Sequence, residues 1–278
     1  MFLSGDNFNM ICNLSIYERK YYDRYITSRL ENILFINEDN GKLIDSIKSK
    51  KNIIFTRVEY LDYFISDILS ILEDKFILVT HNSDIESGNN DIILNHKLLI
   101  NWYGQNMNKN YSLTCGIPIG LSNKVWKNTN FDMIIKNRNN PKTKLLYFNF
   151  ALSTNPNRRN INDLLIQNGF NKNKNMSWDE YIEDLSKFKF AISPQGNGAD
   201  CHRTWECLYL GVIPIVIESN EMSFFSDLPI LFIKSYDIIT EKFLEKTYSD
   251  FFKNKIFNIE KLKISYWKNV LLYEISKH

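Results

Sequence analysis

Short apolar runs alternate along the chain with segments of helical periodicity. Three of these runs, Ile33–Asn37, Asn52–Thr56 and Phe76–Thr80, have the length and composition of buried strands. Between them, Gly41–Lys50 and Val58–Glu73 place apolar residues three and four positions apart, which is typical of helices. Strands that alternate with helices predict an α/β protein with a parallel sheet.

The polar stretch Lys136–Lys144 divides this pattern into two halves. It contains Pro141, one of only six prolines, and we interpret it as a linker. The second half is expected to contain strands at Leu145–Phe150, Phe188–Ser193, Val212–Ile217 and Ile230–Ile233, and helices at Arg159–Asn168, Ser177–Lys187, Cys201–Leu210 and from Thr240 onward. We therefore predict domains at 1–139 and 140–255, followed by a C-terminal segment at 256–278.

The composition narrows the class of protein. The 278 residues are 44% hydrophobic, which is enough for a sizeable core, and 34 basic against 32 acidic residues give a net charge of +2. This near-neutral charge gives no electrostatic reason to expect nucleic acid as a partner. Four scattered cysteines do not form a disulfide framework, and no apolar run has the length of a signal peptide or a membrane span. We expect a cytoplasmic protein whose oligomeric state is open.

Two of the ten glycines, Gly196 and Gly198, lie in one loop between an apolar strand and a helix. Asp200 is expected to be the N-cap of that helix and Gly211 its left-handed C-cap. The VIPIVI run that follows predicts a strand buried on both faces. Because glycines let a ligand approach the backbone and a helix N-terminus offers free N–H groups, this unit predicts an anion site.

Two charged residues of the same helix extend the prediction. Arg203 lies in the first turn, where its guanidinium could bind a phosphate in bidentate fashion. Glu206 follows three residues later on the same face, where its carboxylate could accept bonds from two ribose hydroxyls. The pattern indicates a pocket for a nucleoside-diphosphate sugar, and the alternative interpretation is a surface salt bridge between the two side chains.

This segment resembles the donor-binding region of the exostosin-like glycosyltransferases of family 47 type. The resemblance rests on Ser193-Pro194-Gln195-Gly196, Arg203, Glu206 and Gly211-Val212-Ile213-Pro214-Ile215. It implies the GT-B fold, with two Rossmann-like α/β/α domains facing each other across a cleft and the last helix packed back on the first domain. It also implies a glycosyltransferase that binds a nucleotide sugar, with UDP as the expected nucleotide, and that usually inverts the anomeric carbon. Cys201 departs from the family pattern, in which Ser is common at that position.

The expected donor-binding residues are Arg158, Arg159, Ser193, Gly196, Gly198, His202, Arg203 and Glu206. Arg158 and Arg159 follow the first strand of the second half, and ligands of parallel sheets gather at the carboxyl ends of strands. One of this pair is expected to meet the pyrophosphate, and the sequence leaves open which one.

The general base is expected in the first domain. His81 and Asp84 follow the strand Phe76–Thr80, again at a carboxyl end. An inverting transfer needs one group that takes the proton of the acceptor hydroxyl. Asp84 is the first candidate for this role and His81 is the second.

No metal or other cofactor is expected. Arg203 and the helix dipole can compensate the charge of the departing diphosphate, and Cys201, His202 and Cys207 have poor spacing for zinc. The expected partners are a nucleotide-sugar donor and a glycan or glycoprotein acceptor. Two alternatives stay open: a catalytically inactive nucleotide-sugar or glycan-binding module, and a phosphotransferase.

Overall fold

The computed structural model describes the chain from Met1 to His278, apart from residues 27–29, 31, 109–110, 124, 126–129 and 254. The chain divides into two compact units, which we call the first unit (Met1–Trp126 with Lys263–His278) and the second unit (Lys127–Leu262). The division precedes the linker expected near 139, because helix α7 (Phe131–Asn137) packs against other helices of the second unit. The C-terminal segment of the first unit begins at Lys263 rather than at residue 256.

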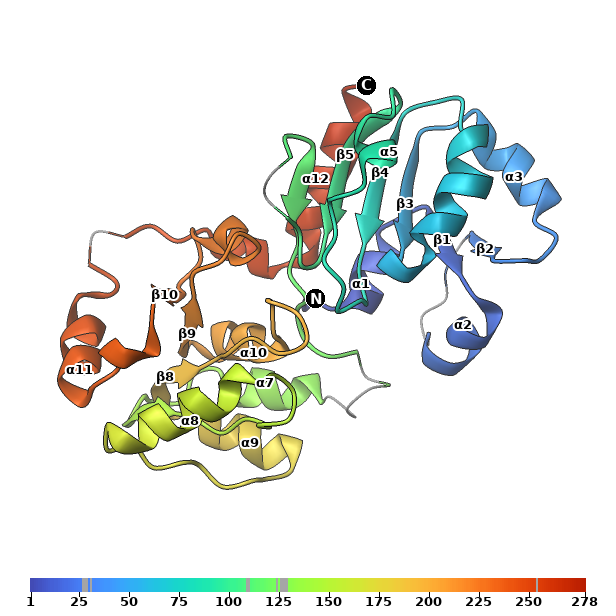
Figure 1. The fold of residues 1–278 in the computed structure, drawn as a ribbon. Coiled ribbons are helices and arrows are strands. Elements are labelled where there is room, and N and C mark those ends of the chain that lie inside the picture. Colours follow the sequence, from blue (N-terminus) through green and yellow to red (C-terminus); the bar gives the residue numbers. More distant parts are fainter. Residues whose placement is uncertain (27–29, 31, 109–110, 124, 126–129, 254) are drawn as a thin grey trace. The chain divides into compact units, whose positions relative to one another are not determined.

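A six-stranded parallel sheet forms the centre of the first unit, in the order β2-β1-β3-β4-β5-β6 (Figure 1). The strands are β1 (Leu14–Tyr17), β2 (Ile33–Phe35), β3 (Asn52–Thr56), β4 (Phe76–Thr80), β5 (Leu99–Gly104) and β6 (Thr114–Gly116). β3 and β4 have the predicted bounds, whereas β1 was not predicted. The chain runs outward in one direction after β1 and in the other after β3, so the carboxyl ends of these neighbouring strands form a topological switch point.

Helices pack on both faces of this sheet (Figure 1). They are α1 (Gly5–Met10), α2 (Arg19–Tyr25), α3 (Gly41–Lys48), α4 (Leu61–Tyr63), α5 (Asp91–Leu94) and α12 (Ile264–Ser276). The single helix expected at Val58–Glu73 is instead a series of 3-10, α and π turns, although its apolar stripe is buried. The C-terminal helix α12 packs against β3 and β4, and its Glu274 accepts a hydrogen bond from Asn101 (2.9 Å).

The second unit contains a four-stranded parallel sheet in the order β10-β9-β8-β7. Its strands are β7 (Lys144–Tyr147), β8 (Phe188–Ile192), β9 (Ile213–Ile217) and β10 (Leu231–Ile233). All four were predicted with small differences at their ends. β9 lies between β8 and β10 and is buried over most of its length, as its uninterrupted apolar run predicts.

Helices cover both faces of this second sheet as well. They are α7, α8 (Asn157–Gln167), α9 (Trp178–Leu185), α10 (His202–Leu210) and α11 (Glu241–Asp250). On one face, Phe190 and Ile192 of β8 join a core with Leu165 of α8 and Leu244 of α11. The helices α7, α9 and α10 contact one another on the opposite face. No helix in the described parts of the chain is long and apolar enough to cross a membrane.

Candidate functional site

The loop between β8 and α10 is held in place by Arg158, from the first turn of α8. The Arg158 guanidinium donates hydrogen bonds to the backbone carbonyls of Gln195 (2.8 Å), Pro194 (3.0 Å) and Ala151 (3.2 Å). Asn155 Nδ2 donates to the next carbonyl along the loop, that of Gly196 (3.0 Å). Three successive loop carbonyls are therefore bound by side chains that follow β7, and the loop has its shape before any ligand arrives.

Gly196 lies so close to this clamp that a side chain would crowd it. A Cβ at this position would lie 3.3 Å from Nη2 of Arg158 and 3.6 Å from Sγ of Cys201. Neither Gly196 nor Gly198 has a left-handed backbone, so the close approach of Arg158 is the reason for glycine at 196. The Gly196 N–H donates to the Gly198 carbonyl (3.1 Å), which tightens the loop further.

Replacing Arg158 by Lys is expected to loosen this loop. A lysine keeps the charge but carries its donors on a single nitrogen, which cannot serve three separate carbonyls. Since hydrogen bonds to charged groups contribute about 1.5–3 kcal/mol each, we expect the free energy of unfolding to fall by about 2 kcal/mol. Urea unfolding measures this, with Arg159→Lys on the exposed side of α8 as the matched control. Equal stability of the two variants would contradict the clamp.

Helix α10 begins at His202 with Cys201 as its N-cap, so the N-cap predicted at Asp200 is wrong. The Asp200 carboxylate instead accepts the single N–H of Trp205 Nε1, which is shared between its two oxygens (2.8 and 3.0 Å). Trp205 is fully buried, and a buried indole N–H needs an acceptor. At the other end of the helix, Gly211 takes the predicted left-handed C-cap conformation with a φ of 67°.

The two cysteines of this region lie in surroundings that disfavour the thiolate form. Sγ of Cys201 donates to the Pro194 carbonyl (3.2 Å), and burial raises the pKa of this thiol to about 11. Burial also raises the pKa of Cys207, which lies inside α10. Both thiols therefore stay protonated near neutral pH. In the described part of the chain, no three His, Cys, Asp or Glu side chains gather closely enough to hold a metal ion.

Arg203 is oriented by a chain of hydrogen bonds that ends in a buried carboxylate. Its Nε donates to the phenol oxygen of Tyr181 (3.2 Å), and the Tyr181 hydroxyl donates to Oε2 of Glu206 (2.7 Å). The guanidinium also lies over the rings of Tyr147 and Tyr181, at 5.9 and 5.5 Å from their centroids. Burial by itself would lower the pKa of Arg203, but Tyr181 and Glu206 raise it above its ordinary value. The side chain is thus a fixed cation.

The terminal nitrogens of Arg203 have no hydrogen-bond acceptor among the described residues. Arg158, in contrast, uses its Nε and one terminal nitrogen on the loop carbonyls and its other terminal nitrogen on the Ala151 carbonyl. The pKa of Arg158 is lowered first by burial and also by the charge of Arg203, so the two cations lie near each other. An anion bound between them would relieve this repulsion, and Arg203 has the free donors to bind it.

Of the other expected donor-binding residues, some are hydrogen-bonded to protein groups and others are partly or fully exposed. Glu206 is only 5% exposed and supports Tyr181, and its expected contact with ribose stays a prediction. The Ser193 hydroxyl is hydrogen-bonded to that of Thr204 (2.9 Å), which ties the end of β8 to α10. His202 is partly buried at the start of α10, and Arg159 is exposed on α8.

Sequence reasoning did not identify Asn155 and Tyr181 as parts of this site. Asn155 carried a usable signal, because it follows β7 at the same carboxyl end as Arg158. Tyr181 carried none, because its contacts with Arg203 and Glu206 join two helices that are separate in the sequence.

In the first unit, His81 has the surroundings of a structural histidine. It is 1% exposed and its ring stacks on Phe8, with 5.3 Å between centroids. Its Nε2 lies 2.9 Å from the Pro118 carbonyl oxygen, and its Nδ1 accepts from the N–H of Asn82 (2.7 Å). Both ring nitrogens are engaged with backbone groups, which disfavours a role as base. Asp84 is exposed on the loop after β4, and its catalytic role stays a prediction.

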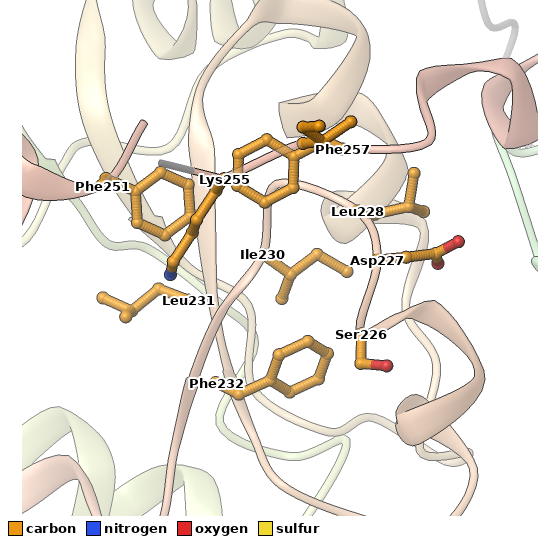
Figure 2. A pocket seen from close by; sticks show the side chains of 10 residues that line it. Ser226, Asp227, Leu228, Ile230, Leu231, Phe232, Phe251, Lys255 and Phe257 are labelled. Atoms are coloured by element: carbon orange, nitrogen blue, oxygen red, sulfur yellow. The ribbon is translucent and has the colours of Figure 1, made fainter. Parts of the chain in front are cut away.

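A pocket of about 310 Å³ lies elsewhere in the second unit, at the amino end of β10 (Figure 2). Its lining includes the apolar side chains of Leu228, Ile230, Leu231, Phe232, Phe251 and Phe257. The nearby Asp227 is paired with Lys261 (2.8 Å). Since ligands of parallel sheets bind at the carboxyl ends of strands, we do not assign the nucleotide to this pocket.

The fold is similar to that of a solved glycosyltransferase. A crystal structure of an alpha1,3-fucosyltransferase aligns with 95% of this chain and 90% of its own, at a TM-score of 0.50 and 11% sequence identity. No protein-family model and no curated protein sequence matches the chain. The similarity confirms the predicted fold class, a GT-B-like fold with two parallel α/β sheets. It does not show membership of the exostosin family.

Proposed function

We propose that this protein is a glycosyltransferase that moves a sugar from a nucleoside diphosphate to a hydroxyl of a glycan or glycoprotein acceptor. The observation that carries the proposal is the cationic side chain of Arg203 in the first turn of α10, with its terminal nitrogens free. The fold shared with a fucosyltransferase supports the same reaction class.

The diphosphate binds where three features of the second unit coincide. Arg203 offers two parallel N–H donors to phosphate oxygens. The N-terminus of α10 adds the positive end of the helix dipole. The clamped loop at 194–196 holds its shape, so little ordering is needed when the ligand binds.

Transfer breaks the bond between the anomeric carbon and the diphosphate oxygen, and negative charge grows on the leaving group. Arg203 is positioned in advance by Tyr181 and Glu206, so it stabilises this charge without reorganisation. The protein supplies the compensating charge through its own cations, and we therefore propose transfer that is independent of metal. Inversion of the anomeric carbon is proposed on the resemblance to the exostosin-like motif alone.

The identity of the sugar nucleotide follows from two separate indications. The exostosin-like motif favours UDP, and the similar solved structure introduces fucose as a candidate sugar. We keep UDP as the first nucleotide and test GDP beside it.

A thermal-shift screen with UDP- and GDP-linked sugars, followed by product mass, tests the proposal. A ligand that binds only the native protein stabilises it by about 2.7 kcal/mol at 100 times its dissociation constant. We expect one sugar nucleotide to raise the melting temperature and, with a panel of glycans, to yield a product heavier by one sugar, also in EDTA. A rise in melting temperature without a product would support the binding module. A product heavier by one phosphate would support a phosphotransferase. No change of melting temperature with any nucleotide would contradict the donor site.

A further inference from the structure

Among the described residues of the first unit, three buried side-chain polar atoms have no hydrogen-bond partner: Oδ1 of Asp6, Nδ2 of Asn82 and Oδ1 of Asn101. The first two are joined by a common neighbour, Asn123. Asp6 lies in α1 and is 8% exposed, and Asn82 follows β4 at its carboxyl end. The first atom is an acceptor and the second a donor. Since buried polar groups are nearly always paired, Oδ1 of Asp6 indicates a missing donor and Nδ2 of Asn82 a missing acceptor, and a hydroxyl can be both.

Asn123 connects the two residues and defines their polarity. Its Oδ1 accepts from the backbone N–H of Asp6 (3.1 Å), and its Nδ2 donates to Oδ1 of Asn82 (3.2 Å). Because a backbone N–H can only donate, the atom of Asn123 that faces it must be the amide oxygen, and the atom that faces Asn82 must be the amide nitrogen. That nitrogen needs an acceptor, so it faces the oxygen of Asn82, and Nδ2 of Asn82 is left as the free donor. Gly5, the neighbour of Asp6 in the chain, is in close contact with Asn82, since a Cβ on Gly5 would lie 1.8 Å from Oδ1 and 2.9 Å from Nδ2 of Asn82.

The pair lies near the topological switch point of the six-stranded sheet, between the carboxyl ends of β1 and β3. Burial first, and the charge of Asp6 as a further cause, raise the pKa values of Tyr17 at the end of β1 and of Tyr21 in α2. Arg57, directly after β3, stacks on the Tyr21 ring (4.3 Å) and donates to the Asn82 carbonyl (3.0 Å). Ligands of open α/β sheets bind at such points.

We propose that Asp6 and Asn82 bind the reactive hydroxyl of the acceptor sugar and that Asp6 is the general base. This inference rests on the proposed glycosyltransferase function. The hydroxyl donates to Oδ1 of Asp6 and accepts from Nδ2 of Asn82. As its oxygen bonds to the anomeric carbon of the donor, the bond from that carbon to the diphosphate breaks. The electron pair leaves with the diphosphate, and the proton moves to Asp6.

The environment of Asp6 suits this role. Burial raises the pKa of its carboxyl to about 6, so it is ionised at neutral pH and is still basic enough to take a proton. The ionisable groups around it are the phenols of Tyr17 and Tyr21, with His81 and Arg57 beyond Asn82. We expect the rate of transfer to fall as the pH drops below about 6.

The test compares Asp6→Asn with wild type, using the donor and acceptor found in the screen above. The amide keeps the shape of the carboxyl but cannot take the proton, so we expect kcat to fall at least about 100-fold while the thermal shift with the donor is unchanged. Asp91→Asn, at an exposed aspartate in the first turn of α5, is the matched control and is expected to behave as wild type. Asp6→Glu keeps a carboxyl and is expected to retain measurable transfer with a displaced acidic limb of its pH profile.

Asn82→Asp tests the other half of the site. Asn82 has a φ of 58°, which aspartate tolerates, and the substitution turns the free donor into an acceptor. We expect the KM for the acceptor to rise at least about 10-fold with donor binding intact.

Transfer by Asp6→Asn within about threefold of wild type would overturn the inference and leave the donor site standing, because a structural water would then explain the unpaired atoms. Loss of transfer in Asp84→Asn with normal transfer in Asp6→Asn would likewise overturn it and restore Asp84 as the base. A wild type that transfers no sugar from any donor would overturn the proposed function and this inference with it.

Discussion

Replacing Arg203 by alanine is expected to lower kcat/KM for sugar transfer at least about 1,000-fold. A charge-assisted bidentate contact contributes about 1.5–3 kcal/mol, which corresponds to a loss of about 10- to 150-fold in donor affinity. Removing a donor that stabilises charge in the transition state costs a further ~100-fold or more in kcat. Steady-state kinetics separate the two effects, and titration calorimetry with the free nucleoside diphosphate measures the first alone.

Three variants distinguish the charge of Arg203 from its geometry. Arg203→Lys keeps the positive charge but not the planar guanidinium, and its kcat/KM for sugar transfer is expected to fall by about 10- to 100-fold. Tyr181→Phe removes the hydroxyl that orients the guanidinium, and we expect kcat/KM for sugar transfer to fall by about 10-fold. Arg138→Ala, at an exposed arginine of the same unit, is the matched control with unchanged kinetics. Full activity of Arg203→Ala would rule out the donor site.

The Asp6→Asn variant is expected to be more stable than wild type, by an amount that depends on pH. Burial raises the pKa of Asp6 from 3.8 to about 6, so folding disfavours the charged form. Because the pKa is higher in the folded state, the stability of the wild type is fully present below about pH 4 and decreases as the pH rises through 6. A pKa shift of this size lowers the free energy of unfolding of the wild type at pH 8 by about 2–3 kcal/mol.

Urea unfolding at pH 4 and at pH 8 measures this difference. We expect the two proteins to differ little at pH 4 and Asp6→Asn to be about 2–3 kcal/mol more stable at pH 8, while Asp91→Asn follows wild type at both values. A gap that does not depend on pH would contradict the raised pKa. Higher stability together with lost transfer would be the pattern of a functional group retained at a cost to folding.

The sequence predicted best the elements that depend only on residues close together in the chain. The runs at Asn52–Thr56 and Phe76–Thr80 are apolar throughout, and both are strands with the predicted bounds. Gly211 was predictable because a helix that ends before a buried strand needs a left-handed residue there. In contrast, β1 has only four residues, and no glycine or proline directly adjoins it, so its place beside β3 depends on pairing between distant segments.

In the candidate site, too, the residues with local sequence signals were predicted and those that depend on distant partners were not. Arg203 and the glycine loop were identified from their spacing, because one loop and one helix position them. Asp200 was misassigned because its true partner, Trp205, became visible only when both were placed in the core. Asp6 was missed because nothing local marks it: its significance comes from Asn82 and Asn123, which lie far away in the chain.

The most direct test of the donor site is a crystal structure of the protein with a nucleoside diphosphate, UDP first and GDP second. The account predicts a phosphate oxygen within hydrogen-bond distance of a terminal nitrogen of Arg203, beside the first turn of α10. Well-ordered nucleotide elsewhere in the chain, with the Arg203 nitrogens still unpaired, would contradict it.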